Sequence, residues 1–333
     1  MNYDIVTIGS ATVDYFADTD SELIRIDTRT SHEELLAFPL GGKILINELN
    51  TTSGGGGTNT AVAFSRLGLH TAYLGKLGMD ATGDFVLDAL AAENISFIGK
   101  RAGKTGVSFV LNSIRDDRTI LAYKGANNCL LPADVPAITA PWVYLSSMLE
   151  QSWQTVVDLV CTSTFKLAFN PSSYQAAMGY QQLRPLVDRV SILVMNREEA
   201  CLFLGRDEHQ DSDLPELVRA LAQVPGQITA VTDGARGVWV YDGKDHVHAA
   251  SPRPDLKILE TTGAGDAFAA TFTAALIRGL PITSALDYGM SNAESVLQHK
   301  GAKEKLLHWE ELLDISRSNP RNIVSSSALV LSH

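Results

Sequence analysis

The sequence predicts an α/β fold: a doubly wound, mainly parallel sheet flanked by helices, with a small β-sheet lid. From Pro141 onward, short apolar segments alternate with helical ones, which is typical of a parallel sheet covered on both faces. Two earlier regions, about residues 15–50 and 104–127, interrupt this alternation with partly polar, strand-like segments. Because neither region has the spacing of a helical crossover, we expect them to build a separate lid.

We expect one domain over residues 1–320, with the two lid segments inserted in it. The first segment contains a strand-like stretch at 43–49, and the second contains two such stretches, at 106–112 and 119–124, joined by a charged hairpin turn. Residues 321–333 form a C-terminal tail, whose uncharged part is a candidate edge strand.

Composition excludes several classes of partner. The 333 residues are 45% apolar and 20% charged, and 27 Lys and Arg against 38 Asp and Glu give a net charge of −11. Such an acidic chain disfavours non-specific binding to nucleic acid or to anionic membrane, although a small anionic cosubstrate needs only a local positive potential. No apolar run approaches the ~18 residues of a membrane span, and no basic leader precedes Asp4, so we expect a cytoplasmic protein.

The cysteines and histidines show no metal or disulfide pattern. Cys129, Cys161 and Cys201 are far apart and odd in number. His246 and His248 would share a face of a strand, but a pair alone does not predict a metal site.

The first candidate ligand site follows residues 3–9, a short buried strand that ends at a glycine. Asp14 stands just beyond it, and ligands of open α/β sheets collect at the carboxyl ends of strands. A turn or capping role for Asp14 is equally open at this point.

Four consecutive glycines, residues 54–57, run into an apolar helix that ends at Gly68. Glycines let a ligand approach the backbone closely, and Asn59 offers it both a donor and an acceptor. A flexible linker is the alternative, but linkers do not lead straight into an apolar helix.

Polar groups follow three strand-like segments of the second half, at 166–169, 192–195 and 229–232. These groups are Asn170 with Pro171, Asn196 with Glu199, and Thr232 through Gly237. All are expected at the ligand-binding edge of the sheet.

A second glycine loop, Gly263-Ala264-Gly265, opens a helix of small apolar residues. The free N–H groups and the partial positive charge of a helix N-terminus bind anions. Asp266 lies beside that anion site, where a carboxylate can take a proton from a hydroxyl that attacks phosphorus. Alone, this short motif favours a tight turn and an acidic residue that suits the helix dipole, and it is the order of the other signals along the chain that favours the anion site.

These residues, in this order, resemble the ribokinase-like (PfkB-type) carbohydrate kinase family, including its adenosine and nucleoside kinase branch. The resemblance covers about residues 3–302 and implies a ribokinase-like fold with ATP as cosubstrate. The motifs that carry it are residues 54–61, residues 66–68, Asn196 with Glu199, Thr232 with Gly234 and Gly237, and residues 261–268.

The resemblance implies that Asp266 is the general base, and that the amides of Gly263, Ala264 and Gly265 form an anion hole for the γ-phosphoryl group. The acceptor-binding residues that it implies are Asp14, Gly55, Gly56, Asn59 and Glu150.

For the nucleotide, the resemblance implies contacts from Asn196, Thr232, Gly234, Gly237 and, near the adenine, Asn292. Glu199 would hold Mg2+, through water, and the backbones of Glu260 and Thr262 would hold a monovalent cation such as K+.

Two positions depart from the family pattern. Gly56 stands where the first signature commonly has a larger residue, a lysine in ribokinase, so the pocket is wider and the acceptor need not be ribose. Glu260 replaces the usual aspartate of the second signature, which leaves dependence on K+ open.

The leading hypothesis is an ATP-dependent kinase that phosphorylates a hydroxyl of a sugar or sugar-like substrate. A nucleoside kinase is the alternative within the same fold, and a non-catalytic sensor of nucleotide or sugar is the alternative from another class. A dinucleotide-binding oxidoreductase is excluded because the glycine-rich run does not follow the first strand. We expect a homodimer through the exposed face of the lid.

Overall fold

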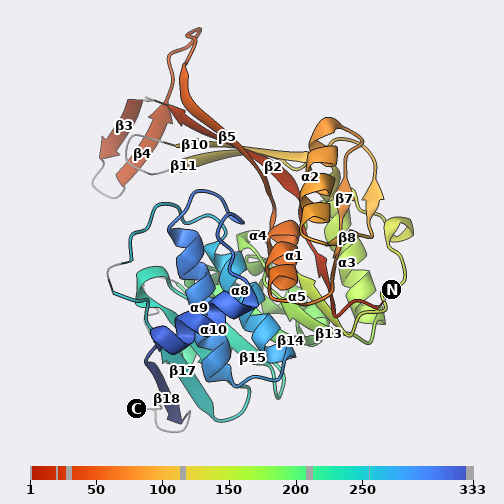
Figure 1. Cartoon of the computed structure of the whole chain (residues 1–333), viewed down its shortest axis with the longest axis vertical. Coiled ribbons are helices and arrows are strands. Elements are labelled where there is room, and N and C mark those ends of the chain that lie inside the picture. The colour runs from red at the N-terminus through yellow and green to blue at the C-terminus, as the bar shows by residue number, and fades with distance from the viewer. Residues whose placement is uncertain are drawn as a thin grey trace.

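The computed structural model describes residues 2–19, 22–27, 32–112, 118–207, 213–254 and 256–327. Within them, a ten-stranded sheet runs through the molecule in the order β18-β17-β16-β15-β14-β13-β12-β1-β6-β8 (Figure 1). Its strands are β1 (Ile5–Ile8), β6 (Thr71–Leu74), β8 (Ser96–Phe97), β12 (Trp142–Leu145), β13 (Lys166–Phe169), β14 (Val190–Asn196), β15 (Ile228–Thr232), β16 (Val238–Tyr241), β17 (His246–Ala250) and β18 (Ile323–Ser327).

The sheet is mainly parallel, as predicted. Every pair from β8 across to β15 is parallel. Strands β16, β17 and β18 then close one side in antiparallel pairs. The candidate edge strand of the tail is confirmed over Ile323–Ser327, so the main sheet continues past residue 320.

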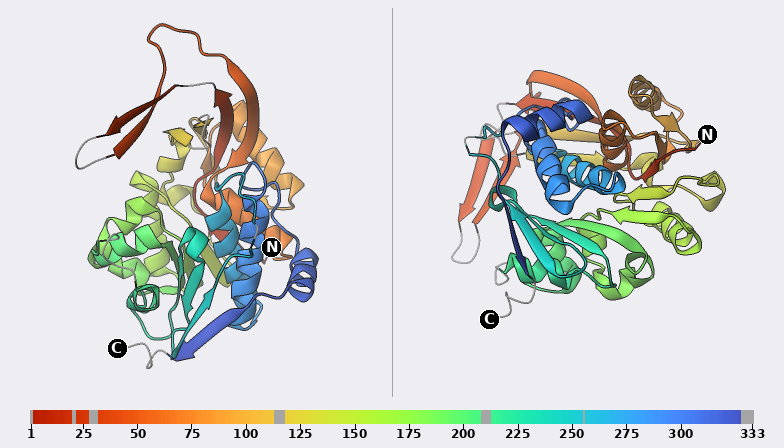
Figure 2. Two further views of the ribbon diagram at one scale, coloured as in Figure 1. Left: turned by 90° about the vertical axis from the view of Figure 1, so that its left-hand side faces the viewer. Right: turned by 60° about the horizontal axis from the view of Figure 1, so that its bottom comes forward.

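Helices cover both faces of the sheet because its strands alternate their side chains between two cores. In β1, Ile5 packs into one core, and Val6 and Ile8 into the other. The first core is covered by α1 (Gly56–Arg66), α2 (Ala81–Ala92), α8 (Ala264–Ile277), α9 (Ile282–Leu297) and α10 (Trp309–Ser318) (Figure 2). The second is covered by α3 (Glu150–Thr162), α4 (Ser173–Ala176), α5 (Gly179–Val187), α6 (Arg197–Leu204) and α7 (Leu214–Ala220).

Short elements complete the described chain. They are the parallel pair β7 (Lys76–Leu77) with β9 (Lys100–Arg101), and the 3-10 turns η1 (Gly125–Asn128), η2 (Pro132–Asp134) and η3 (Gly234–Arg236).

A separate small sheet stands at the end of the molecule opposite β18 (Figure 1). Its order is β11 (Arg118–Tyr123), β10 (Gly106–Asn112), β2 (Thr12–Thr19) and β5 (Ile46–Gly54). A hairpin of β3 (Glu22–Asp27) and β4 (His32–Ala37) extends from it. The small sheet is the one expected from the two inserted segments, and its role as a lid stays a prediction.

The strand expected at residues 43–49 is wrong in its bounds, since β5 covers Ile46–Gly54 and runs into the glycine-rich stretch. Helix α1 begins at Gly56, so Gly55 alone joins strand to helix. Its φ is 93°, and a Cβ there would lie 2.5 Å from the carbonyl oxygen of Ser10. The linker alternative is therefore wrong: three of the four glycines belong to regular elements.

Membrane-spanning helices and disulfides can be assessed in the part of the chain that the structure describes. There, no helix combines the length and apolar character that a membrane crossing requires. The three cysteines are free.

Candidate active site

The two glycine-rich segments meet where α1 packs beside α8. Asn59 of α1 donates a hydrogen bond of 2.8 Å from Nδ2 to Oδ2 of Asp266. Gly263 precedes α8 in the left-handed conformation, with φ at 81°, and a Cβ there would lie 2.4 Å from the Cβ of Ala302. Glycine is thus required by both backbone angle and space, and the sharp turn places Asp266 in the first turn of the helix.

The N-terminus of α8 faces open space. The first bond of the helix runs from the N–H of Ala267 to the carbonyl of Gly263, at 2.8 Å. The N–H groups of Gly265 and Asp266 precede it, so no intrahelical acceptor satisfies them. A Cβ built on Gly265 would meet no heavy atom within 4 Å. An anion can therefore reach these amides.

A polar cavity of about 330 Å³ lies in front of this N-terminus, at the carboxyl ends of β1, β12, β13, β14 and β15. Its lining comprises Ser10, Gly56, Ser146, Ser147, Asn170, Pro171, Ser172, Val194, Met195, Asn196, Glu199, Thr232, Gly263, Gly265 and Asp266. The three polar groups predicted at the ligand-binding edge of the sheet are thus brought together with Asp266.

Asn196 and Glu199 are held by reciprocal hydrogen bonds at the start of α6. The N–H of Glu199 donates to Oδ1 of Asn196 at 2.7 Å, and the N–H of Asn196 donates to Oε2 of Glu199 at 2.9 Å. Burial, with smaller contributions from the charges of Glu198 and Asp266, raises the pKa of Glu199 to about 7. A carboxylate so poorly solvated gains from any cation that reaches it.

Burial also raises the pKa of Asp266, against the hydrogen bond from Asn59 and the charge of Lys303, which lower it. A raised pKa makes a carboxylate a stronger base while it is ionised, which suits proton abstraction.

An apolar cavity of about 460 Å³ adjoins the polar one, and both include Thr232 and Gly265 in their walls. Its lining also contains Gly234 and Gly237, together with Phe268 and other apolar side chains of α8 and α9. The predicted nucleotide residues of the 232–237 loop therefore face a cavity whose walls suit a flat, apolar ring.

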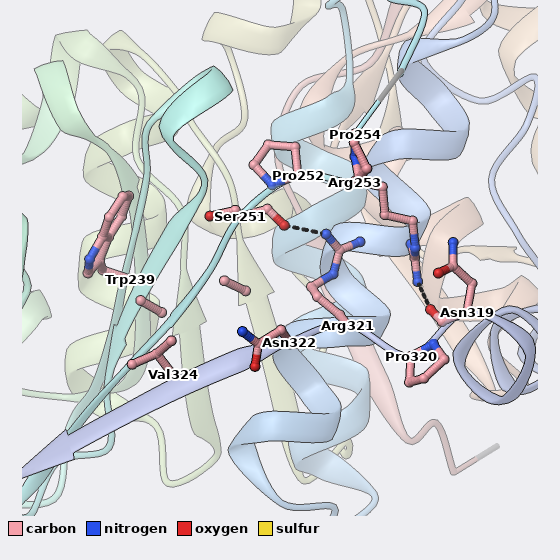
Figure 3. Close-up of a pocket in the computed structure, with 12 residues that line it drawn as sticks. Trp239, Ser251, Pro252, Arg253, Pro254, Asn319, Pro320, Arg321, Asn322 and Val324 are labelled. Carbon is pink, nitrogen blue, oxygen red and sulfur yellow. Dashed lines mark hydrogen bonds between the residues drawn. The ribbon is translucent and has the colours of Figure 1, made fainter.

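One wall of the apolar cavity contains a buried ionic network, in which Arg253 and Glu294 of that wall are joined by Arg321. Arg253 donates from Nη1 to Oε2 of Glu294 at 2.7 Å, and Arg321 donates from Nη2 to the same oxygen at 2.7 Å. Behind this wall is a separate cleft, where Arg321 donates to the carbonyl of Ser251 and Arg253 to that of Asn319 (Figure 3). The network therefore connects Arg321, just before β18 in the chain, to the wall of the apolar cavity.

Asp14 lies within β2 of the small sheet, so it is neither a turn nor a helix-capping residue. Its Oδ1 accepts a hydrogen bond from Thr12 at 2.8 Å, and a Cβ on Gly54 would collide with its Oδ2. Asp14, Gly55 and Asn59 do not line the polar cavity, whereas Gly56 does.

Two predicted ligand residues lie elsewhere. Asn292 is fully buried; it donates to Thr271 Oγ1 at 2.7 Å and accepts from the N–H of Leu307 at 2.8 Å, so its side chain does not face the apolar cavity. Glu150 is exposed at the first residue of α3 and lines neither cavity. The backbone of Glu150 has a φ of 50°, in the left-handed region that residues other than glycine rarely adopt.

The Glu260 side chain is buried and accepts hydrogen bonds from the N–H and the hydroxyl of Thr262, at 3.3 and 2.7 Å. This turn fixes the backbone just before Gly263.

Sequence reasoning missed Ser146, whose hydroxyl is buried with no hydrogen-bond partner among the described residues. A Cβ on Gly56 would lie 2.9 Å from that hydroxyl, so Ser146 occupies the space next to the glycine. The available signal was its position directly after β12, at the ligand-binding edge.

Open amides at a helix N-terminus, a carboxylate beside them, and an apolar cavity that adjoins a polar one form the arrangement expected of a phosphotransferase. The family model described as pfkB family carbohydrate kinase matches residues 4–309, and the chain belongs to this family.

Individual relatives agree with this assignment. Ribokinase of Staphylococcus aureus is 26% identical over 94% of this chain and 99% of its own length. Cytidine kinase of Thermococcus kodakarensis is 25% identical over 80% of this chain and 94% of its own length. The structure of Arabidopsis thaliana ribokinase complexed with ribose and ATP superposes with a TM-score of 0.75, at 21% identity, over 95% of this chain and 99% of that one. The chain is thus an ATP-using sugar or nucleoside kinase, with an alcohol group as acceptor.

Proposed function

We propose that the protein transfers the γ-phosphoryl group of ATP to a hydroxyl of a sugar or sugar-like substrate, with Asp266 as general base. The hydrogen bond from Asn59 to Asp266 is the observation that carries this proposal. It fixes the carboxylate beside the open amides of Gly265 and Asp266, at the junction of the two cavities.

The proposed mechanism depends on positioning and on charge neutralisation. The acceptor hydroxyl gives its proton to Asp266 as its oxygen attacks the γ-phosphorus. The open amides of Gly265 and Asp266 donate to the phosphoryl oxygens as negative charge develops on them, whereas the N–H of Ala264 already donates to the carbonyl of Thr261 at 3.4 Å. The loop 232–237 and the apolar cavity hold the rest of the nucleotide, so that the phosphates end at the N-terminus of α8.

Magnesium fits the oxygen-rich polar cavity, where Asn196 and Glu199 would hold it together with water and phosphate oxygens. Among the described residues no group of three or more His, Cys, Asp or Glu lies together in a way that could hold a metal ion. When bound, Mg2+ supplies positive charge to the phosphates. For K+, the Glu260 carboxylate already accepts from Thr262, so the backbone carbonyls of these two residues are the proposed ligands.

A nucleoside acceptor is the second candidate, and Gly56 favours it. Without a side chain at that position the polar cavity extends to Ser146. The similarity to a cytidine kinase supports this alternative.

We also propose that the small sheet acts as a lid and that two copies pair through it. Leu49, Phe109 and Leu121 share one face of this sheet by its register and expose about half of their surface there, which is unfavourable in a monomer. Sedimentation at micromolar concentration should give a dimer, and a monomer would rule out the pairing.

The free cysteines of the described chain support a reducing location, the cytoplasm.

The test of the function is ADP release from ATP and Mg2+ with a panel of pentoses, hexoses, sugar acids and nucleosides, with and without K+. A response to sugars supports the leading proposal, and a response to nucleosides alone supports the second. An enzyme that binds ATP and responds to no member of the panel contradicts both.

A further inference from the structure

Lys303, in the segment between α9 and α10, reaches the joint between the small sheet and α1. Its ammonium donates to Ser53 Oγ at 3.0 Å and to Thr58 Oγ1 at 2.7 Å. Ser53 belongs to the end of β5 and Thr58 to the first turn of α1, on either side of Gly55. Thr58 in turn donates to the carbonyl of Gly54 at 2.6 Å. A single side chain therefore ties together the elements that carry the glycine-rich run.

The backbone of Lys303 is fixed as firmly as its side chain. Arg66 donates from Nη1 to the carbonyls of Lys303 and Leu306, at 3.0 and 2.9 Å. On the other side, Ala302 fills the space beside Gly263. Lys303 thus lies between the two glycine-rich segments and contacts the first of them through its side chain.

The charges that act on the ammonium are those of Asp14 of β2, Asp266 of α8, Glu93 at the end of α2, and Arg66 of α1. Burial lowers the pKa of Lys303 to about 7, while the charges of Asp14, Asp266 and Glu93 raise it. In return, the charge of Lys303 lowers the pKa of Asp266, as does the hydrogen bond from the amide of Asn59. The glycine-rich run itself carries no cation.

We propose that Lys303 is a positioning residue for phosphoryl transfer: its ammonium fixes the joint that carries Gly56 and Asn59 and keeps the Asp266 carboxylate ionised. The proposal rests on the proposed role of Asp266 as base. A base must be deprotonated to accept a proton, and a neighbouring ammonium favours the deprotonated form. A purely structural lysine would need only the two hydroxyl contacts, which a neutral donor can also make.

The test compares three substitutions at this position in the full chain. Lys303→Met keeps the apolar stem and removes the charge, Lys303→Gln keeps donors without charge, and Lys303→Arg keeps the charge. Lys305→Met, in the same segment but exposed, is the matched control. The readout is a ¹³C NMR titration of the Asp266 side-chain carboxyl, assigned with Asp266→Asn, in protein without nucleotide or acceptor.

We expect Asp266 to titrate at higher pH in Lys303→Met and Lys303→Gln, and as in wild type in Lys303→Arg and Lys305→Met. Unchanged titration in either folded neutral variant overturns the proposal. Because the titration needs no acceptor, it can fail while the kinase assignment stands, and the converse also holds.

Kinetics with the acceptor found by ADP release then provide a second readout. Lys303→Met should lose more of its kcat at pH 6 than at pH 8, since protonated Asp266 accumulates at low pH, and Lys303→Arg should recover the wild-type profile. An equal loss at both pH values would indicate a structural role alone and overturn the proposal.

Discussion

Asn59 and Asp266 are 207 residues apart in the chain and are joined by a hydrogen bond of 2.8 Å between their side chains. The amide of Asn59 uses only its NH2 group in this bond, and its Oδ1 is buried without a hydrogen-bond partner in the described part of the chain. Such a buried, unpaired acceptor is unfavourable unless a ligand hydroxyl completes it. This unpaired acceptor supports the proposal that Asn59 orients the base and binds the acceptor hydroxyl.

The base assignment predicts that Asp266→Asn lowers kcat by a factor on the order of 10² to 10⁴, while ATP affinity stays within a few-fold. The amide keeps the shape of the side chain but cannot take the proton. Steady-state kinetics and nucleotide titration measure the two effects. Asp314→Asn, an exposed change on α10, should alter neither, and near-normal turnover in Asp266→Asn would remove the assignment.

The raised pKa of Glu199 predicts that the stability of the protein depends on pH. Its pKa is raised from 4.5 to about 7, so folding favours its protonated form. Its contribution to the free energy of unfolding is therefore present in full below pH 4.5 and is lost as the pH rises through about 7. Glu199→Gln stays neutral and keeps the bond to the N–H of Asn196, so its Tm should exceed that of wild type at pH 8 and differ less at pH 5.

The control for this comparison is Glu310→Gln, an exposed change on α10. Thermal unfolding followed by circular dichroism at both pH values suffices. A Tm difference between Glu199→Gln and wild type that is the same at pH 5 and pH 8 would contradict the raised pKa.

The network behind the apolar cavity predicts a loss of stability in Arg321→Met. The Arg321 side chain is 3% exposed, and its removal leaves the buried carboxylates of Asp287 and Glu294 with Arg253 as their remaining guanidinium. Breaking a buried pair in this way costs about 3 kcal/mol. Urea unfolding should show this loss, whereas Arg317→Met, at a residue 74% exposed, should change stability by less than about 0.5 kcal/mol. Similar losses in both variants would contradict the role of the network.

The buried position of Asn292 predicts that its substitution lowers stability and leaves the KM for ATP nearly unchanged. Asn292→Ala leaves the buried Thr271 hydroxyl and Leu307 N–H without their partner, at a cost of about 1–3 kcal/mol for each. Because its side chain does not face the apolar cavity, the KM for ATP should stay within about twofold. Ala293→Leu, at the adjacent position that lines the cavity, should raise this KM instead. A large rise in Asn292→Ala would restore the nucleotide role implied by the family resemblance.

Much of the fold could be predicted from the sequence because its central strands are buried on both faces. Strand β13 has the bounds predicted for it, Lys166–Phe169, and the strands expected at 192–195 and 229–232 lie within β14 and β15. The end of β5 could not be placed, since glycines carry no side-chain pattern to distinguish strand from loop.

The candidate site was predicted where residues share a local motif and missed where contacts join distant segments. Asp266 and Gly263 form a motif that fixes its own local geometry. Ser146 and Lys303 enter the site only through tertiary packing, which local sequence does not encode. Asn292 shows the same limit, because its hydrogen bonds to Thr271 and Leu307 join segments whose contact the local sequence does not indicate.

The two cavities are built by different stretches of the chain. All lining residues of the apolar cavity lie between Thr232 and Leu297, whereas Ser10, Gly56 and Ser146 bring the first half of the chain to the polar one. If the function proposed above holds, mutations in the first half of the gene would alter the polar cavity and leave the lining of the apolar cavity unchanged. Chimeras that exchange only the N-terminal half between relatives offer a direct way to transplant acceptor preference.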